Sequence, residues 1–283
     1  MSQTLRDLLK AGKSRLEEKK ISPVDAELLL AHLLGATRME LHAKQFDLSE
    51  SERERIASEF SELITERLSG RPTQYIIGEA PFRYLMFDVG EGVLIPRPET
   101  ELLVDEVLHQ LARYADPISI VDLGSGSGAI AISLVSETAK KKDLRVVAVE
   151  KNAGALKWLN QNIAKFDLPI RVVHASAHDA LEGVKCDVVV ANPPYVPSIQ
   201  ELPEELRHEP ADALFGGSVD GMAIPAEFIE AGARLLKPGG LFACEHNEVQ
   251  GPAFAALLAK DFESIALHRD LNDRPRFTTA IRR

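Results

Sequence analysis

The chain has 283 residues, of which 45% are hydrophobic and 27% charged, a composition that excludes a disordered chain and suits two domains of about 150 residues each. Its 43 acidic and 33 basic residues leave a net charge of −10, so the summed field repels polyanions and we expect no direct nucleic-acid binding. The N-terminal stretch carries charges throughout and holds no apolar run long enough for a signal peptide or a membrane span, which predicts a cytoplasmic protein with no membrane association.

The N-terminal part, residues 1–70, is predicted to be a small helical bundle. Ser22 precedes a proline and an acid, an order typical of a helix start, and the leucines that follow end at Gly35. Ser49 has an acid three residues later and opens a second amphipathic run that ends before Gly70. The spacing of the apolar residues therefore predicts helices that bury one face each.

From residue 71 the pattern changes. Residues 71–98 carry short aromatic stretches between glycines and prolines, which predicts a β-hairpin linker. Strands and helices then alternate through 99–283, which implies an α/β domain with a mostly parallel seven-stranded sheet covered on both faces. No helix separates the last two strands, so we expect an antiparallel edge there. The predicted strands are Ile118–Leu123, Leu144–Val149, Ile170–His174, Cys186–Ala191, Leu241–Glu245, Ser264–Leu267 and Phe277–Ile281.

Neither the cysteines nor the histidines predict a metal site. Cys186 and Cys244 lie far apart in apolar, strand-like segments, which indicates buried, reduced thiols rather than a disulfide framework. The eight histidines show no metal-ligand spacing. We therefore expect chemistry that needs no metal.

A glycine-rich loop follows the first strand of the predicted sheet and opens a helix at Ala129. Glycines let the backbone turn sharply and approach a ligand, and the helix that follows presents free amides. The next strand ends in Glu150, where a carboxylate can accept hydrogen bonds from two ribose hydroxyls. Such a loop can be a mere tight turn, but this combination favours a nucleoside cofactor. The cofactor-binding residues predicted from it are Asp122, Gly124, Ser125, Gly126, Gly128 and Glu150.

The order of the glycines indicates which cofactor is bound. Dinucleotide sites use G-x-G-x-x-G opposite a pyrophosphate, whereas here the glycines alternate as G-x-G-x-G behind Asp122. An acid at the mouth of the site suits a cationic ammonium or sulfonium group and fits a pyrophosphate poorly. The sequence therefore predicts S-adenosyl-L-methionine.

The fourth predicted strand ends in Asn192-Pro193-Pro194-Tyr195, at the edge where open α/β sheets bind ligands. Prolines hold the chain rigid and cannot donate, so nearby backbone carbonyls can accept, and the Asn192 side chain adds another acceptor. Two fixed acceptors can hold both N–H bonds of a planar amino group while its nitrogen faces the cofactor methyl. Tyr195 is expected to cover the flat face of that group. The alternative is an ordinary strand end with a core tyrosine.

These motifs resemble the Rossmann-like methyltransferases that act on planar amino nitrogens. Further stretches narrow the likeness, and over nearly its whole length the chain resembles the HemK/PrmC family, the peptide chain release factor N5-glutamine methyltransferases. The stretches that carry the resemblance are Asp122 to Gly128, Glu150, Asn192 to Tyr195, Arg71 to Gly78, Leu94 to Glu101, Glu209-Pro210, Ala213-Leu214, Gly216-Gly217 and Glu245-His246.

The resemblance implies a methyl transfer from S-adenosyl-L-methionine to the side-chain amide nitrogen (N5) of the glutamine in the Gly-Gly-Gln motif of class 1 peptide chain release factors. It implies that Asn192 and Pro193 hold the glutamine amide, with Pro194 and Tyr195 beside them as substrate-binding residues. It also implies that the segment from Ile95 to Thr100 lies over the cofactor. The helical domain would help to grip the release factor.

Two positions depart from the family pattern. Ser176 stands where members of the family often carry an acid near the adenine, so we expect that cofactor contact to come from the Ser176 hydroxyl or from a group elsewhere in the chain. Asn247 stands where glycine is commoner. Asn192 is counted with the cofactor-binding residues as well, because it faces the reactive end of the cofactor.

Three other functions remain open. The same tetrapeptide can hold an adenine amino group, as in an adenine-N6 nucleic-acid methyltransferase, although the acidic charge and the lack of a basic recognition domain argue against it. A glutamine of a ribosomal protein is an alternative substrate, because specificity lies on the helical domain and linker. A binding-only scaffold that kept its cofactor pocket is the third. The long loop at residues 196–222 is our candidate for a gate beside Tyr195.

Overall fold

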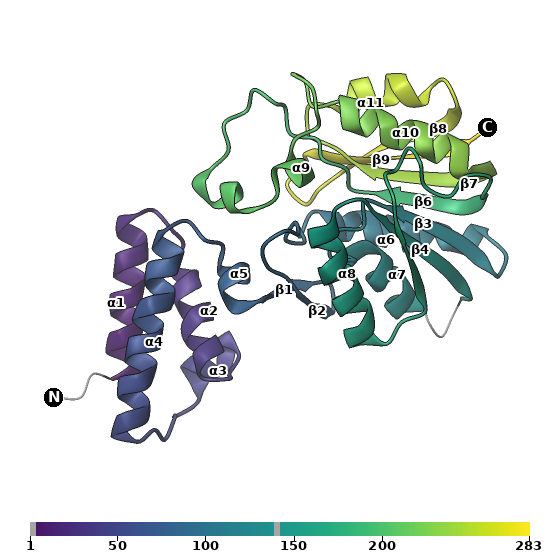
Figure 1. Ribbon diagram of the computed structural model, residues 1–283. Helices are drawn as coiled ribbons and strands as arrows, with labels where there is room; N and C mark the ends of the chain where they lie inside the picture. The colour runs from purple at the N-terminus through teal and green to yellow at the C-terminus, as the bar shows by residue number, and fades with distance from the viewer. Residues whose placement is uncertain (1–3, 139–141) are drawn as a thin grey trace. The chain divides into compact units, whose positions relative to one another are not determined.

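Figure 1 shows the computed structural model of the protein, in which residues 4–138 and 142–283 are described. They fall into two compact units, Met1–Glu79 with Leu202–His208, and Ala80–Glu201 with Glu209–Arg283. This division does not test the domain limits expected at residues 70 and 98, which remain a proposal. Within the described ranges no helix is both long and apolar enough to cross a membrane.

The first unit is a bundle of helices with a leucine- and isoleucine-rich interior. The predicted helix starts are confirmed: the Ser22 hydroxyl accepts a hydrogen bond from the backbone N–H of Val24, and Ser49 forms a reciprocal capping box with Glu52. The buried side chains that the helices share include Leu16, Leu29, Leu30, Ile56, Phe60 and Ile64. The helices are α1 (Leu5–Glu18), α2 (Pro23–Leu33), α3 (Arg38–Ala43), α4 (Glu50–Leu68) and α5 (Thr73–Ile77).

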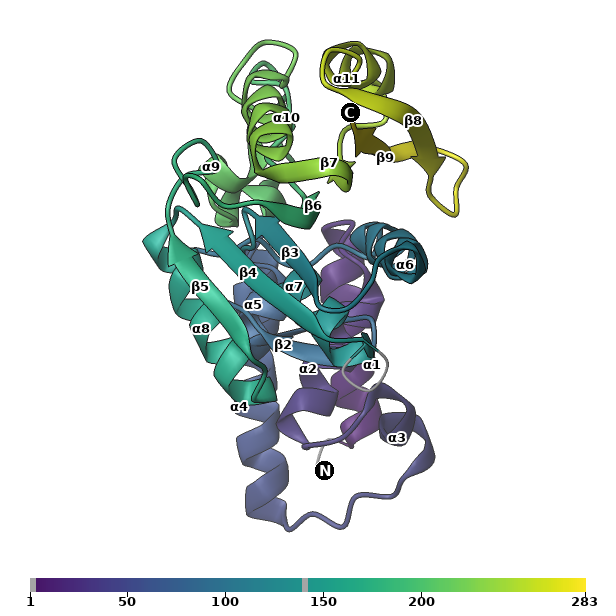
Figure 2. The ribbon, with the colours of Figure 1, turned by 90° about the vertical axis from the view of Figure 1, so that its right-hand side faces the viewer.

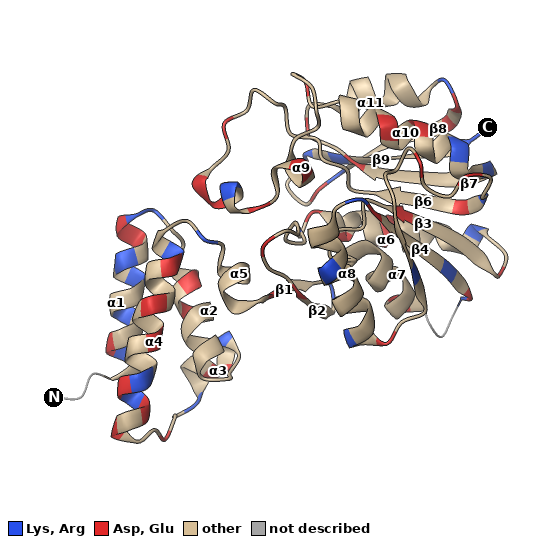
Figure 3. Cartoon of the chain, in the orientation of Figure 1, with Lys and Arg blue, Asp and Glu red and all other residues tan. Residues whose placement is uncertain are grey.

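Residues of both charge signs are interspersed along α1 and α4 (Figure 3). One acid of this unit, Glu27, is buried and accepts hydrogen bonds from Lys13 and Arg38. Burial alone would raise the pKa of Glu27, but the two cationic donors outweigh it and lower the pKa to about 2. This carboxylate is therefore charged at neutral pH and joins three helical segments of the bundle.

A short two-stranded sheet follows the helices, as the predicted hairpin requires. Its strands are β1 (Glu79–Phe82) and β2 (Leu85–Asp88). Phe82 and Phe87 are both fully buried and pack edge to face, with ring centroids 6.1 Å apart. Two of the aromatic residues of this segment are thus buried, whereas Tyr84, in the turn between the strands, is 83% exposed.

The second unit is built on a seven-stranded sheet in the order β5-β4-β3-β6-β7-β9-β8. The first five strands in this order are parallel, and β9 runs antiparallel to both β7 and β8. The predicted α/β class, the number of strands and the antiparallel edge are confirmed. The strands are β3 (Ile118–Leu123), β4 (Leu144–Glu150), β5 (Ile170–His174), β6 (Cys186–Ala191), β7 (Leu236–Glu245), β8 (Phe262–Arg269) and β9 (Pro275–Arg282).

Helices cover both faces of this sheet (Figure 2). On one face lie α6 (Thr100–Gln110), α7 (Ala129–Thr138) and α8 (Ala153–Phe166), and on the other lie α10 (Ala223–Leu235) and α11 (Gly251–Leu258). The central strands β3 and β6 are buried almost throughout, which explains their continuous apolar sequences. Next to β3 the strand order reverses, and parallel sheets bind ligands at such a point.

The structure differs from the sequence prediction at the start of β7. That strand begins at Leu236, five residues before the predicted Leu241. The intervening Lys237-Pro238-Gly239-Gly240 has the composition of a turn. It extends β7 past a register shift opposite Cys186, a local irregularity that periodicity cannot anticipate.

Candidate active site

A cavity opens at the carboxyl ends of β3, β4 and β6. In-register pairing places the last residue of β3, Leu123, opposite both Val149 and Ala191. The segments that follow these three strands therefore leave the sheet at one edge. Of the residues predicted from the sequence, Gly124, Ser125, Gly126, Glu150, Ser176, Asn192 and Pro194 line the cavity.

The glycine loop adopts left-handed backbone conformations at Gly124, Gly126 and Gly128, and the last two positions serve different purposes. Gly126 has a φ of +55°, and a Cβ built on it meets nothing within 4 Å. Gly128 has a φ of +86°, and a Cβ there would lie 2.8 Å from side-chain atoms of Ile132 and Leu159. Gly126 therefore keeps space open in the cavity, whereas Gly128 allows the loop to pack against α7 and α8.

We expect alanine at these two glycines to give different defects. Each substitution costs about 1–2 kcal/mol for a left-handed backbone, and Gly128→Ala adds steric overlap of about 1–3 kcal/mol in a packed region. Gly128→Ala should thus lower the thermal unfolding midpoint more, while Gly126→Ala should weaken cofactor binding by about tenfold or more, since its methyl enters the cavity. Thermal unfolding and calorimetric titration with S-adenosyl-L-methionine measure the two effects. Equal losses of stability with unchanged affinity would contradict a cofactor role for Gly126.

The glycine loop is held in place by its neighbours. The backbone N–H groups of Gly124 and Ser125 donate to the carbonyl of Val149 at 2.8 and 3.0 Å. The fully buried Asn162 of α8 donates to the Ser127 carbonyl at 3.0 Å, and its Oδ1 accepts from the Asp88 N–H at 2.8 Å. The loop is therefore pre-organised by β4 and α8, and Asn162 is a supporting residue that the sequence analysis missed.

Glu150 receives hydrogen bonds on both carboxylate oxygens. Its Oε2 accepts from the Gly126 N–H at 2.9 Å, and its Oε1 accepts from the Asn152 N–H at 2.7 Å. Each carboxylate oxygen has a further lone pair, and the residue lines the cavity. Glu150 can thus orient the loop and still accept hydrogen bonds from a ligand.

Asp122 lies elsewhere than predicted. Its side chain is fully buried within β3 and does not line the cavity, so the acid does not stand at the mouth of the site as expected, and its cofactor-binding role stays a prediction. Strand residues under helices on both faces have no route to the surface, which is the physical reason. Burial, with a smaller effect of the nearby Glu150 charge, raises the pKa of Asp122 to about 7. Oδ2 accepts from the Ala131 N–H, and Oδ1 has no partner among the described groups.

Another buried acid, Glu209, fixes the segment that holds Ile95 and Arg97 at the border of the cavity. Its Oε2 accepts from the Ile95 N–H at 2.9 Å, and its Oε1 accepts from the Arg97 guanidinium at 2.5 Å. The Glu209 side chain is only 1% exposed. Arg97 and the following Pro210 both line the cavity. The Glu209-Pro210 pair, which in sequence resembles an ordinary turn, thus joins two segments that border the site.

Ser176 lines the cavity with its hydroxyl already engaged. The hydroxyl donates to Asp179 Oδ2 at 2.7 Å, and its oxygen accepts from the Asp179 N–H at 3.1 Å. Asp179 is exposed. Asp179 therefore fixes the Ser176 hydroxyl, and the contact of Ser176 with the cofactor stays a prediction.

The Asn192 amide is held from the side by a hydroxyl. Its Nδ2 donates to Thr100 Oγ1 at 3.1 Å, and no described residue donates to its Oδ1. Thr100 begins α6 and is itself buried and in contact with the cavity. The Asn192 side chain can therefore offer an acceptor oxygen to a ligand while its amino group stays occupied.

Pro193 and Tyr195 do not line the cavity, unlike Asn192 and Pro194. The Tyr195 hydroxyl donates to Glu245 Oε1 at 2.9 Å. Burial, and then the negative charge of Glu245, raise the pKa of Tyr195 well above its ordinary value. Tyr195 is consequently a hydrogen-bond donor near neutral pH, and its expected place over the substrate remains a prediction.

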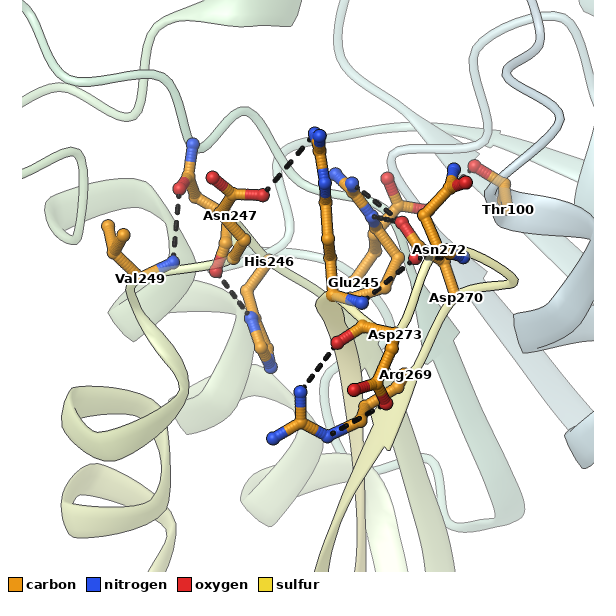
Figure 4. Close-up of polar contacts among 12 residues, drawn as sticks. Thr100, Glu245, His246, Asn247, Val249, Arg269, Asp270, Asn272 and Asp273 are labelled. Carbon is orange, nitrogen blue, oxygen red and sulfur yellow. Dashed lines mark hydrogen bonds and ion pairs between the residues drawn. The ribbon is translucent and has the colours of Figure 1, made fainter.

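Glu245 ends β7 and links the two polar groups just described. It is fully buried, and its Oε2 accepts from the Thr100 hydroxyl at 2.6 Å. Burial raises its pKa, against which the Thr100 and Tyr195 hydrogen bonds and the nearby Arg276 charge act. Figure 4 shows Glu245 and Thr100 beside the polar turn between β8 and β9, where Arg276 pairs with Asp270 at 3.0 Å.

Two family models match the chain. The PrmC N-terminal domain matches residues 7–78, and the methyltransferase small domain matches residues 98–272, which is more than half of the chain. The first model falls on the helical part and the second on the sheet.

Full-length relatives agree with these matches. The chain is 37% identical to a release factor glutamine methyltransferase of Mycolicibacterium smegmatis, over 98% of both chains. It is 39% identical to one of Streptomyces coelicolor, over 90% of this chain and 89% of the relative. A third, of Caulobacter vibrioides, is 35% identical over 100% of this chain and 98% of the relative.

Solved structures with lower identity share the fold. A 16S rRNA methyltransferase of T. thermophilus, in complex with AdoMet and guanosine, superposes with a TM-score of 0.53 at 20% identity, covering 72% of this chain and 50% of that one. A ribosomal protein L11 methylase of Lactobacillus delbrueckii gives 0.50 at 18% identity, covering 69% and 84%. The predicted methyltransferase fold is confirmed. Together with the family models and the full-length relatives, this shows that the chain belongs to the release factor glutamine methyltransferase family.

Proposed function

We propose that this protein transfers a methyl group from S-adenosyl-L-methionine to the side-chain amide nitrogen of the glutamine in the Gly-Gly-Gln motif of class 1 peptide chain release factors. The observation that carries the proposal is the Asn192 amide, whose amino group is occupied by Thr100 and whose oxygen is left to accept within the cavity. The full-length relatives, which are release factor glutamine methyltransferases, support a glutamine of a release factor as the substrate.

The cavity suits this cofactor in three respects. A side chain at Gly126 would enter the open space, Glu150 offers lone pairs suited to ribose hydroxyls, and Asp122 has a buried, unpartnered oxygen beneath the loop. A cation near Asp122 would favour its charged form. S-adenosyl-L-methionine, when bound, supplies an electrophilic methyl group on a sulfonium centre.

In the proposed reaction Asn192 binds and orients the glutamine amide. An amide nitrogen is a poor nucleophile because its lone pair is delocalised into the carbonyl group. Asn192 Oδ1 and the Pro193 backbone carbonyl would each accept a hydrogen bond from one N–H group of the glutamine amide. These hydrogen bonds fix the direction of the nitrogen and stabilise the positive charge that develops on it. These acceptors hold the departing proton until solvent takes it, so no strong general base is needed.

The helical unit is proposed to hold the body of the release factor. Its exposed α1 and α4 carry charges of both signs, which suits a protein surface better than a polyanion. The cytoplasmic location proposed from the sequence is where release factors act in translation termination.

Mass spectrometry of the acceptor tests the proposed function. Incubation of the protein with S-adenosyl-L-methionine and a class 1 release factor should add one methyl group, which fragmentation places on the glutamine of the Gly-Gly-Gln motif. A release factor with glutamate at that position serves as the matched control. Methylation of a ribosomal protein or of duplex DNA in parallel incubations, with none on the release factor, would refute the assignment.

A further inference from the structure

We infer that Glu245 is a positioning residue that acts through Thr100 to set which end of the Asn192 amide faces the substrate. This inference rests on the proposed function, because it concerns the residue proposed to hold the glutamine. Neither Thr100 nor Glu245 is needed to bind the reacting nitrogen directly. Their role follows from the direction in which each hydrogen bond of the chain can run.

Three hydrogen bonds connect the residues in series. Asn192 Nδ2 lies 3.1 Å from Thr100 Oγ1, Thr100 Oγ1 lies 2.6 Å from Glu245 Oε2, and the Tyr195 hydroxyl lies 2.9 Å from Glu245 Oε1. The Thr100 and Tyr195 hydrogen bonds and the Arg276 charge favour the ionised form of Glu245. In that form the carboxylate only accepts, so each hydroxyl must donate its hydrogen to it. The threonine hydroxyl has one hydrogen, and that hydrogen is committed to Glu245.

The hydrogen bond from Thr100 to Glu245 determines the orientation of the Asn192 side-chain amide. Toward Asn192 the threonine oxygen can now only accept, so the amide must present its Nδ2 to Thr100 and leave Oδ1 for the cavity. A flipped amide would place Oδ1 against the lone pairs of Thr100 and would present N–H groups to the N–H groups of the substrate. The flipped amide would therefore face acceptor with acceptor at Thr100 and donor with donor at the substrate, and both contacts are unfavourable.

The residues of this hydrogen-bond series are buried or mutually bonded, so they can hold the Asn192 amide in one orientation. Thr100 is 3% exposed at the start of α6, and Glu245 is 1% exposed at the end of β7. Tyr195 occupies the second oxygen of Glu245, which prevents the carboxylate from rotating away from Thr100. Buried networks whose members are all satisfied are rigid, which suits a positioning role.

Variants of Thr100 test the inference with a matched control. Thr100→Val keeps the shape and removes the hydroxyl, and we expect kcat to fall about thirtyfold, with the KM for release factor and the cofactor affinity each within about threefold of wild type. Thr100→Ser restores the hydroxyl and should recover kcat to within about threefold. A Thr100→Val enzyme with wild-type kcat, or a serine variant as slow as the valine variant, would overturn the inference.

A pair of substitutions that reverses the direction of the hydrogen bonds among Asn192, Thr100 and Glu245 gives a sharper test. Asn192→Asp places a carboxylate against the threonine oxygen and should reduce kcat about a hundredfold, while Glu245→Gln should reduce it about tenfold. In the double variant, the glutamine introduced at position 245 can donate to Thr100, and Thr100 can donate to the carboxylate introduced at position 192, with the buried charge unchanged in number. We expect the double variant to be at least tenfold faster than Asn192→Asp alone. Multiplicative losses would show that the residues act independently and would contradict the inference.

An observation without any acceptor substrate separates this inference from the proposed function. In 15N-labelled protein, the side-chain amide signal of Asn192, assigned by its loss in Asn192→Ala, should exchange with solvent at least tenfold faster in Thr100→Val than in wild type or Thr100→Ser. If release factor is not methylated yet the exchange depends on Thr100, the proposed function fails and the positioning stands. If release factor is methylated and neither exchange nor kcat depends on Thr100, the positioning fails alone.

Discussion

Asn192→Ala should lower turnover by about a hundredfold or more while leaving the affinity for S-adenosyl-L-methionine nearly unchanged. The substitution removes the acceptor oxygen proposed to orient the glutamine amide, and it leaves the glycine loop and Glu150 intact, since neither is bonded to the Asn192 side chain. A radiolabel assay with release factor measures turnover, and calorimetry measures cofactor affinity.

The matched control for this prediction is Ser198→Ala, an exposed position on the loop that follows the tetrapeptide. Its turnover should stay within about twofold of wild type, because the substitution removes only an exposed hydroxyl. An equal loss of turnover and cofactor affinity in Asn192→Ala would show that the residue serves the cofactor and would contradict its assignment to the substrate.

Glu150→Gln should weaken cofactor binding about a hundredfold, the second large effect. Glutamine has one acceptor oxygen and one NH2 group, yet it would face the backbone N–H groups of both Gly126 and Asn152. One of these contacts becomes donor against donor, at about 1–3 kcal/mol, and the charge-assisted bonds proposed to the ribose are lost as well. Calorimetric titration measures the dissociation constant, and kcat at saturating cofactor should change only severalfold.

Glu182→Gln offers a control for the removed charge, because Glu182 is exposed and lies outside the cavity lining. Its cofactor affinity should match wild type. If Glu150→Gln also bound the cofactor within twofold of wild type, Glu150 would be a structural brace of the loop and no more.

The sequence sufficed for those parts of the fold that local pattern determines. The continuous apolar runs at Ile118–Leu123 and Cys186–Ala191 predicted strand limits that the structure confirms to the residue. Parallel strands buried on both faces need such runs. The position of the glycine loop, Glu150 and Asn192 around one cavity also followed, because strand order places consecutive carboxyl ends at the same edge.

What the sequence could not provide are contacts between distant residues. Thr100 and Glu245 are separated by 145 positions, and nothing local indicates that their side chains meet. Glu209 reaches Ile95 across 114 positions in the same way. Thr100 did lie in a stretch that resembled the family, but only the folded sheet shows that it holds the amide of Asn192.

The position of Asp122 beneath the glycine loop could not be predicted for another reason. The sequence shows the residue type of Asp122, but side-chain depth within a strand depends on the helices that cover it, and these are not encoded in the local motif. The result is a carboxyl group inside the protein, with one oxygen unpartnered, instead of one at the surface.

Asp122 is therefore able to adjust its ionisation to the occupant of the site. With a pKa raised to about 7, Asp122 is partly protonated near neutral pH, and a positive charge bound in the adjoining site would draw it toward the carboxylate form. With an uncharged occupant in the site, Asp122 would take up a proton, which would spare the interior an isolated anion. In the proposed catalytic cycle, exchange of spent for fresh cofactor would thus be accompanied by the movement of a proton in and out of the protein.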